Sequence, residues 1–423
     1  MVRPCLPLLP VLFALLAAVP ATAGLPTPAA IAAPADAELA QTTTGAGGAE
    51  DARAAVQANA KAAEERAELE RGLAYIDSLP SASPAITDSL AAVGGALLLR
   101  GHPDLATRVF ARSIALRKAN GRDMALARHY LAVGSGFATG DRFVEGEGFR
   151  REAVALMKSL DARPASLAEA LTDLGISLNT RGKYDEARVV LEQAVDQIDS
   201  GIGKRSMKLV APLQMLGAVH LALGHPDLAE AVWRRRLALC ETESGDHADL
   251  RRGVALSDLA LLHAQAKQHA EAERLLLQAL ALRKKADLRP TFGTAVALNR
   301  LAGVYGDSGR PQEAEATFER ALALMQSIPA SAGWDTAAVL HDYGVFLRQQ
   351  DQAERATALL TQAFALRVAV QPAHHLTRQS ADALAALYHA SGAEAAALQI
   401  EERMRAEALR PVQDQGGASA SAP

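Results

Sequence analysis

Hydrophobic and small residues recur with helical spacing, and from about residue 84 onward they form a pattern of paired segments. Each pair has a Gly or Ala in its first segment and a second one twelve residues later. The first column comprises Gly94, Gly134, Gly175, Gly217, Ala260, Ala302, Gly344 and Ala385, and the second Ala106, Gly146, Ala187, Ala229, Ala272, Ala314, Ala356 and Ala397. Members of the first column lie 40 to 43 residues apart. The pattern predicts about eight consecutive helix-turn-helix units over residues 84–409.

The residues around the two columns explain how such pairs would pack. Small residues allow two antiparallel helices to approach closely, and large apolar side chains then fill the space beside them. Large side chains stand four residues after the second column, at Phe110, Leu191, Trp233, Leu276, Phe318 and Leu360. Arg150 and Glu401 interrupt this set, and the neighbouring Phe149 and Ile400 predict a one-residue adjustment in those two units.

The turns within the pairs have their own chemistry. Glycine accepts the left-handed conformation that ends a helix, and proline suits the first turn of the next one. The expected left-handed glycines are Gly101, Gly182, Gly224, Gly309 and Gly392, and the expected helix-starting prolines are Pro103, Pro226 and Pro311.

The best unit runs from Leu298-Asn299-Arg300-Leu301-Ala302-Gly303-Val304-Tyr305 to Gly309-Arg310-Pro311-Gln312-Glu313-Ala314, followed by Phe318. These residues resemble the tetratricopeptide repeat, with its Leu-Gly or Leu-Ala pair, large residue three further on and A-x-x-x-F/L motif. The period of about 42 residues is similar to that of kinesin-light-chain repeats. The resemblance implies an all-α fold, a right-handed α–α superhelix of about eight helix-turn-helix repeats over residues 84–409.

The resemblance also implies that a protein or peptide binds in a concave groove formed by the first helices. Groove positions lie three residues before and one residue after the first column, at Thr172, Ile176, Gln214, Ala218, Ser257, Leu261, Asn299, Gly303, His341 and Val345. Kinesin-light-chain-like repeats have Asn-Asn here, whereas this chain retains Asn299 and has Asp173, Asp258 and Asp342 at the second position. Replacing Gln214, Asn299 and His341 by Ala is expected to weaken partner capture without unfolding the chain.

The regions outside the repeats have different compositions. Residues 1–23 resemble a secretory signal peptide, with Arg3, an apolar run from Leu6 to Val19, and small residues at Ala21-Thr22-Ala23. Residues 24–50 are predicted to be a disordered Ala/Pro/Thr/Gly linker, 51–80 an N-terminal capping helix and 410–423 a disordered tail. The expected setting is the periplasm or cell envelope of a bacterium, with no membrane span in the mature chain.

The charge balance and the reactive residues argue against several classes of function. The chain has 48 acidic and 44 basic residues, a formal charge of −4 that argues against nucleic-acid binding. Cleavage would leave Cys240 alone, so an intrachain disulfide is excluded and a buried structural thiol is expected. No zinc-spaced Cys pairs, HExxH, GxSxG or P-loop motif occurs, so neither a metal, a cofactor nor a catalytic residue is predicted.

Histidines and arginines leave a few further candidates. His220 and His263 share one repeat position and could stack, but packed histidines are expected rather than ligands. His374-His375 is expected in a solvated loop. The arginines at 234–236 and 251–252 indicate either a solvated outer face or a contact for an acidic partner or membrane surface.

These observations predict an exported, non-enzymatic repeat scaffold that binds another protein or peptide. Two alternatives remain open at this point: an enzyme or enzyme subunit with a site across the groove, and a membrane-anchored structural protein that keeps residues 1–23.

Overall fold

The structure, a computed structural model, describes residues 66–67, 69–74, 76–78, 84–139, 142–285, 292–328, 333–370 and 374–409. The predicted signal peptide, linker and tail, and most of the predicted capping helix, lie outside these ranges. Every regular element in these ranges is helical, and none of them is a strand. None of these helices has the length and apolar character that a membrane span requires.

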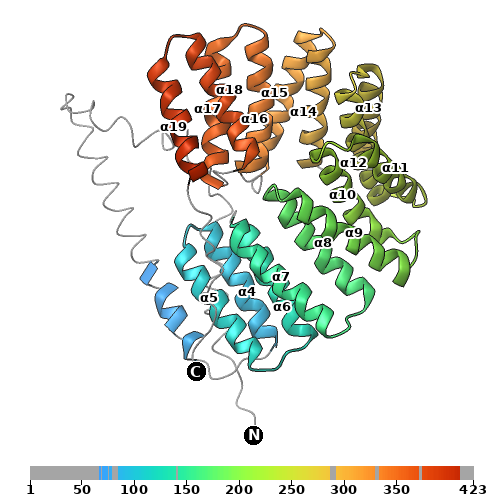
Figure 1. The fold of residues 1–423 in the computed structure, drawn as a ribbon, viewed down its shortest axis with the longest axis vertical. Helices are drawn as coiled ribbons and strands as arrows, with labels where there is room; N and C mark the ends of the chain where they lie inside the picture. Colours follow the sequence, from blue (N-terminus) through green and yellow to red (C-terminus); the bar gives the residue numbers. More distant parts are fainter. Residues whose placement is uncertain are drawn as a thin grey trace, which may run out of the picture. The chain divides into compact units, whose positions relative to one another are not determined.

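The chain divides into two compact units, Met1–Gly140 and Asp141–Pro423. The first contains helical residues within 66–77 and the helices α4 (Pro84–Leu99), α5 (Pro103–Lys118) and α6 (Met124–Thr139), shown in blue and cyan in Figure 1. Arg108 of α5 binds Glu70 at 2.8 Å and Asp77 at 3.3 Å. These ion pairs attach the helical residues that precede α4 to the first repeat.

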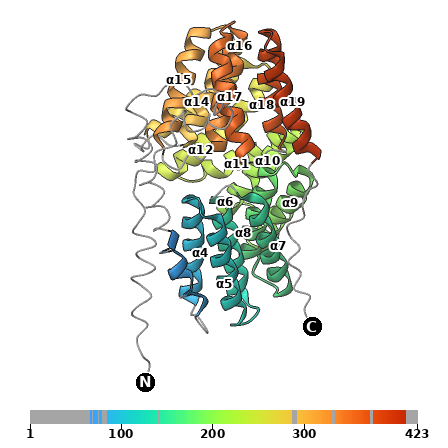
Figure 2. The same cartoon turned by 90° about the vertical axis from the view of Figure 1, so that its left-hand side faces the viewer.

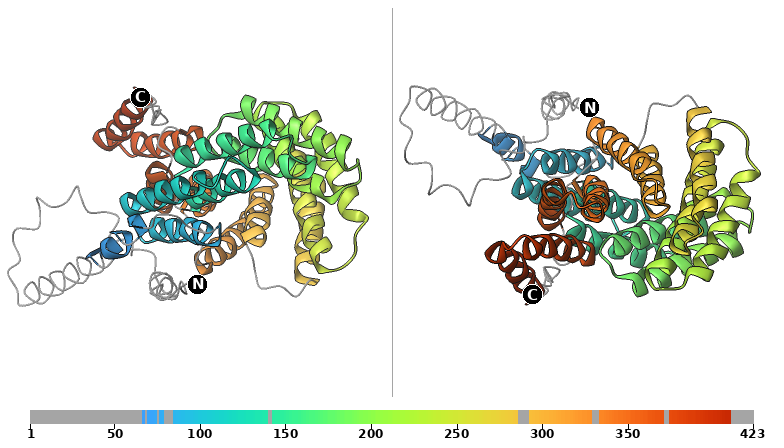
Figure 3. Two further views of the ribbon diagram at one scale, coloured as in Figure 1. Left: turned by 90° about the horizontal axis from the view of Figure 1, so that it is seen from below. Right: turned by 90° about the horizontal axis from the view of Figure 1, so that it is seen from above.

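The second unit contains the remaining helices. They are α7 (Phe143–Ser159), α8 (Pro164–Thr180), α9 (Tyr184–Gly201), η1 (Met207–Leu209), α10 (Val210–Ala222), α11 (Pro226–Glu241), α12 (Asp246–Gln265), α13 (His269–Lys285), α14 (Phe292–Asp307), α15 (Pro311–Ser327), α16 (Gly333–Gln349), α17 (Ala353–Val370), α18 (His375–Ala390) and α19 (Glu394–Leu409). Seven of the eight helix pairs that the columns predicted each lie within one unit, and the remaining two helices, α6 and α7, lie on either side of the boundary between the units. Figure 3 shows that the helices of this unit follow a curved path.

Small residues of the first column receive large side chains from the second helix of the same pair. A Cβ on Gly175 would lie 2.5 Å from Leu191, and one on Gly217 would lie 2.1 Å from Trp233 Nε1. The Trp233 indole also donates a hydrogen bond to the carbonyl of Gln214 at 3.1 Å. The predicted close approach is therefore confirmed, and its physical reason is the volume of the facing side chain.

The predicted turn chemistry is also confirmed. The five expected glycines have φ values between 71° and 77°. Pro103, Pro226 and Pro311 each begin a helix. Two turns without glycine place Lys267 and Asp351 in the same left-handed region, at φ 58°.

Two expectations were wrong. Arg150 itself is only 6% exposed, so the chain buries this arginine near Asp173 and Glu147 rather than shifting Phe149 into its place. His374 is not in a solvated loop: it is the N-cap of α18, is 8% exposed and packs edge-on against Trp334 at 4.9 Å between ring centroids.

The start of α9 contacts the start of α18, although the two are distant in sequence. The Tyr184 hydroxyl lies 3.3 Å from His375 Nδ1, and the two rings meet edge-on at 5.7 Å. A solenoid repeat ordinarily contacts only its neighbours. The curvature of the second unit, which Figure 2 shows from another side, therefore brings the third and eighth repeats of the array together.

Candidate functional site

The first helices of four consecutive repeats, α12, α14, α16 and α18, line a concave pocket of about 650 Å³. Its wall includes half of the predicted groove positions: Leu261, Asn299, Gly303, His341 and Val345. They come together because equivalent positions on successive first helices face the same side of the array. This pocket is called the groove pocket below.

The other five predicted positions do not line the groove pocket. Thr172 is 6% exposed and its hydroxyl donates to the Ala168 carbonyl of its own helix at 2.7 Å. Ser257 is 3% exposed and accepts a hydrogen bond from Arg300. Ile176 is 38% exposed, and Gln214 and Ala218 are half-buried.

Arg300 is fixed in the groove pocket by bonds to the neighbouring repeat. Its Nη1 donates to the Ser257 carbonyl at 2.8 Å, to the Ser257 hydroxyl at 2.9 Å and to Asp258 Oδ1 at 2.9 Å. The other oxygen of Asp258 accepts from buried Arg236 at 2.7 Å. Asp258 thus lies between two guanidinium groups, and its charge is matched within the protein.

Asn299 and Asp342 form a different kind of pair. Asn299 Nδ2 donates to Asp342 Oδ2 at 2.6 Å, while Asn299 Oδ1 is buried and has no hydrogen-bond partner among the described residues. The Asp342 side chain reaches solvent within the pocket, but the surrounding walls limit its hydration and raise the pKa of its carboxyl. The hydrogen bond from the Asn299 amide group and the positive charges of the more distant Arg367 and Arg300 lower this pKa.

His341 is a neutral wall residue at pH 7. It is 4% exposed, and its Nδ1 lies 3.2 Å from the Ser380 hydroxyl, which also accepts a hydrogen bond from Arg367 at 2.7 Å. Burial, followed by the charges of Arg367 and Arg348, lowers the pKa of His341 to about 4. The imidazole therefore adds no positive charge to the pocket.

The sequence pattern missed the charged wall residues Asp307, Arg348 and Asp382. Asp382 lies three residues before Ala385, so extending the groove offset to the eighth repeat would have found it. Arg348 lies four residues after Gly344, one helical turn beyond the offsets considered.

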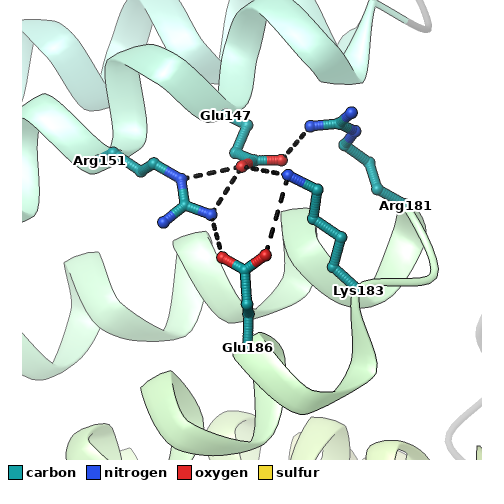
Figure 4. Close-up of polar contacts among 5 residues, drawn as sticks. All are labelled: Glu147, Arg151, Arg181, Lys183 and Glu186. Carbon is teal, nitrogen blue, oxygen red and sulfur yellow. Dashed lines mark hydrogen bonds and ion pairs between the residues drawn. The ribbon is translucent and has the colours of Figure 1, made fainter. Parts of the chain in front are cut away.

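A second polar cluster joins α7 to the turn between α8 and α9, and we call it the Glu147 network (Figure 4). Glu147 is 4% exposed and accepts hydrogen bonds from Arg151 at 2.8 Å, from Lys183 at 3.1 Å and from Arg181. Arg151 and Lys183 also pair with Glu186. Burial alone would raise the pKa of Glu147, but the bonds from Arg151, Lys183 and Arg181 bring it below its ordinary value.

The arginines of 234–236 and 251–252 are engaged with acidic side chains. The pairs are Arg234–Glu230, Arg235–Asp199, Arg236–Asp258, Arg251–Glu243 and Arg252–Asp249. Arg236 is 1% exposed, so this part of the expected outer face is internal. The remaining arginines form a surface whose charge is largely compensated.

The other candidates have ordinary structural surroundings. His220 lies beside His225, with 6.3 Å between ring centroids, whereas His263 Nδ1 contacts Gln268 at 2.5 Å, so the suggested pairing of His220 with His263 is not observed. Cys240 is buried, as expected, and burial raises the pKa of its thiol. Within the described ranges, no group of three or more His, Cys, Asp or Glu residues could hold a metal ion.

The helix pairs and the groove pocket define an α-helical repeat protein of the solenoid class. Residues 166–242 and 251–327 match the family model described as tetratricopeptide repeat, so this part of the chain consists of tetratricopeptide repeats. This family consists generally of non-enzymatic scaffolds for protein interactions. A comparison with curated protein sequences gave no significant match.

Solved structures of other proteins are similar to this chain, and two of them share its fold over most of its length. A Rap protein complexed with Competence and Sporulation Factor is 12% identical, with a TM-score of 0.56 over 82% of this chain and 93% of that one. The apo quorum sensor NprR from B. thuringiensis is 10% identical, with a TM-score of 0.52 over 83% and 95%. A putative kinesin light chain from Podosopora anserina is 24% identical, with a TM-score of 0.38 over 49% and 98%.

Proposed function

We propose that this chain is an exported, non-enzymatic scaffold that binds an extended segment of another protein in the groove pocket. The carrying observation is the pocket itself, a concave space of about 650 Å³ whose wall contains five positions expected to face the groove. Polar groups such as Asn299 can bond a peptide backbone, and Leu261 and Val345 offer apolar contacts beside them. The Rap protein of similar fold, which was crystallised with Competence and Sporulation Factor, is consistent with ligand binding by such an array.

Gly303 provides a direct test because it lies in the pocket wall and a Cβ there would meet nothing within 4 Å. A Gly303→Trp substitution can therefore fill the groove without displacing a packed neighbour. Gly148 of α7 is the matched control, since it is also helical and equally free of neighbours but lies outside the pocket.

The experiment is affinity capture from an extract, with the wild-type chain and both variants as bait. Partners retained by the wild type are expected to be retained by Gly148→Trp and lost with Gly303→Trp, while circular dichroism shows both variants folded. Undiminished capture by folded Gly303→Trp would contradict binding in the groove.

We also propose export by residues 1–23, supported by their short apolar run and the small residues at Ala21-Thr22-Ala23. The setting proposed is a bacterial periplasm or cell envelope. N-terminal sequencing of the chain from producing cells is expected to begin at Gly24. A chain that retains Met1 and fractionates with membranes would support the anchored alternative instead.

A further inference from the structure

The charged side chains of the groove pocket are unequally matched. Arg300 is held by Ser257 and Asp258, whereas Asp342 has the Asn299 amide as its hydrogen-bond donor. Asp307, Asp342 and Asp382 line the same pocket, and among the residues that the structure describes none of the three has a cation within ion-pair distance. Asp342 and Asp382 come from neighbouring first helices, α16 and α18, and Asp307 is the last residue of α14.

Asn299 supplies a second, independent indication. It is 9% exposed and lines the pocket, and its amide nitrogen is already used by Asp342, so its buried Oδ1 is left without a donor. An unsatisfied buried acceptor ordinarily carries a free-energy cost. Asn299, Asp342 and Asp382 thus present acceptors in one pocket, and a donor-rich group would satisfy them.

The remaining wall is apolar and spacious beside these acceptors. Leu261, Val345 and Phe346 line it, and Gly303 adds open volume because it has no side chain. An aliphatic side chain adjacent to the donor group would therefore remove apolar surface from water on both partners.

Arg348 limits where a cation can bind. It lines the pocket on α16 six residues after Asp342, about 9 Å further along a helix that rises about 1.5 Å per residue. Repulsion from Arg348 disfavours binding of a basic group beside it. We therefore expect a basic group to bind beside Asp342 and Asp382 instead.

We propose that the groove pocket selects a peptide segment with an arginine or lysine next to an aliphatic residue, and that Asp342 and Asp382 bind the cation. The guanidinium has five N–H donors and no acceptor, which complements two carboxylates and the Asn299 oxygen. This inference rests on the proposed function, because it assigns the chemistry of the segment that the groove binds.

The test uses a fluorescein-labelled heptapeptide, Gly-Ser-Leu-Arg-Leu-Ser-Gly, and two analogues with citrulline or glutamate in place of arginine. Citrulline keeps the shape of arginine and removes its charge. In fluorescence polarisation at low salt, the arginine peptide is expected to bind at least tenfold more tightly than either analogue. Its affinity is expected to fall as salt is added.

Variants locate the preference. Asp342→Asn together with Asp382→Asn is expected to reduce the arginine preference to less than threefold, because both cation partners are lost. Arg348→Gln is expected to tighten binding of the arginine peptide about twofold by relieving repulsion. Glu192→Gln on α9, which removes one acidic charge outside the pocket, is the control and should leave binding unchanged.

The outcomes separate this inference from the proposed function. Tighter binding of the glutamate peptide, no binding of any of the three peptides, or an arginine preference that survives in the folded double variant would overturn it. If Gly303→Trp still abolishes partner capture in any of those cases, groove binding stands and only the basic specificity fails. An arginine preference unaffected by Gly303→Trp would instead place the peptide outside the groove and overturn the proposed site.

Discussion

The groove pocket and the closely packed region of α7–α11 use polar and small residues in opposite ways. In the packed region, Glu147 receives three donors from its own chain, and the missing side chain of Gly217 makes room for Trp233. In the groove pocket, Asn299 keeps an acceptor unsatisfied, and the missing side chain of Gly303 leaves open space. Polar and small residues therefore stabilise the packing of α7–α11, whereas in the groove pocket they leave a hydrogen-bond acceptor and open space for a ligand.

The two glycines give the largest expected contrast. Gly217→Ala places a Cβ against the Trp233 ring and is expected to lower the free energy of unfolding by about 1–3 kcal/mol. Gly303→Ala meets nothing and is expected to raise it by about 0.5–1 kcal/mol through improved helix propensity. Urea unfolding of both variants measures the difference. Equal effects of the same sign would remove the distinction between packed and open glycines.

Because His341 is buried in the wall of the groove pocket, the free energy of unfolding should depend on pH. Its pKa is about 4 in the folded chain against 6.5 for the ordinary group, so the unfolded chain binds the proton more readily. The stabilisation is complete above pH 6.5 and declines as the pH falls towards 4, by about 3 kcal/mol for this group.

Replacing His341 by Asn removes that titration. The free energy of unfolding of His341→Asn is expected to fall less steeply than that of the wild type between pH 6.5 and 4.5. His247→Asn on α12, which changes an exposed histidine, is the control. Identical slopes for the wild type and His341→Asn would show that the imidazole is not held neutral by burial.

The Glu147 network should respond more weakly, because its cations are partly solvated. Glu147→Gln is expected to lower the free energy of unfolding by roughly 1–2 kcal/mol, since Arg181, Lys183 and Arg151 lose a shared carboxylate. Asp342→Asn, in the groove, is expected to change it by less than about 0.5 kcal/mol. Chemical denaturation at pH 7 measures both changes.

The pH dependence of the free energy of unfolding gives a second test of the Glu147 network. Because the folded pKa of Glu147 is depressed, its stabilisation is present above the ordinary value of 4.5 and is lost as the pH falls through the folded value. Glu147→Gln should therefore lose less stability than the wild type on acidification below pH 4.5. A variant that loses stability as steeply as the wild type would remove Glu147 from this role.

Arg234 of α11 should give the smallest effect. Its side chain is 67% exposed and pairs with Glu230 one turn earlier on the same helix. Arg234→Ala is expected to change the free energy of unfolding by less than about 0.5 kcal/mol, and to leave partner capture unchanged. Reduced capture by this variant would indicate that the arginines of 234–236 and 251–252 contribute to a binding surface.

The repeat pattern predicted the fold well, because close approach and left-handed turns each require particular residue types. Gly217 and Gly224 are recognisable in sequence because glycine leaves room for the Trp233 ring and adopts a φ of 77° without steric cost. The pattern failed at Arg150 and His374, whose burial depends on partners from other elements, such as Asp173 and Trp334. The sequence alone does not show which residues of other elements contact Arg150 and His374.

The groove pocket was predictable only in part for a related reason. Offsets from the first column found Asn299 and His341, but not that Arg300 is held by Asp258 while Asp342 has no cation. That distinction depends on side-chain distances between adjacent repeats. It is also the distinction that carries the proposed specificity.

The central claim, that the groove pocket and not the packed region binds the partner, is tested most directly by site-specific photo-crosslinking. A photoreactive amino acid is placed at Gln349 on the rim of the groove pocket, and separately at Val189 on α9, which is 44% exposed and lies outside it. A crosslinked adduct with the captured partner is expected from position 349 and none from position 189. An adduct from position 189 with none from position 349 would contradict this claim.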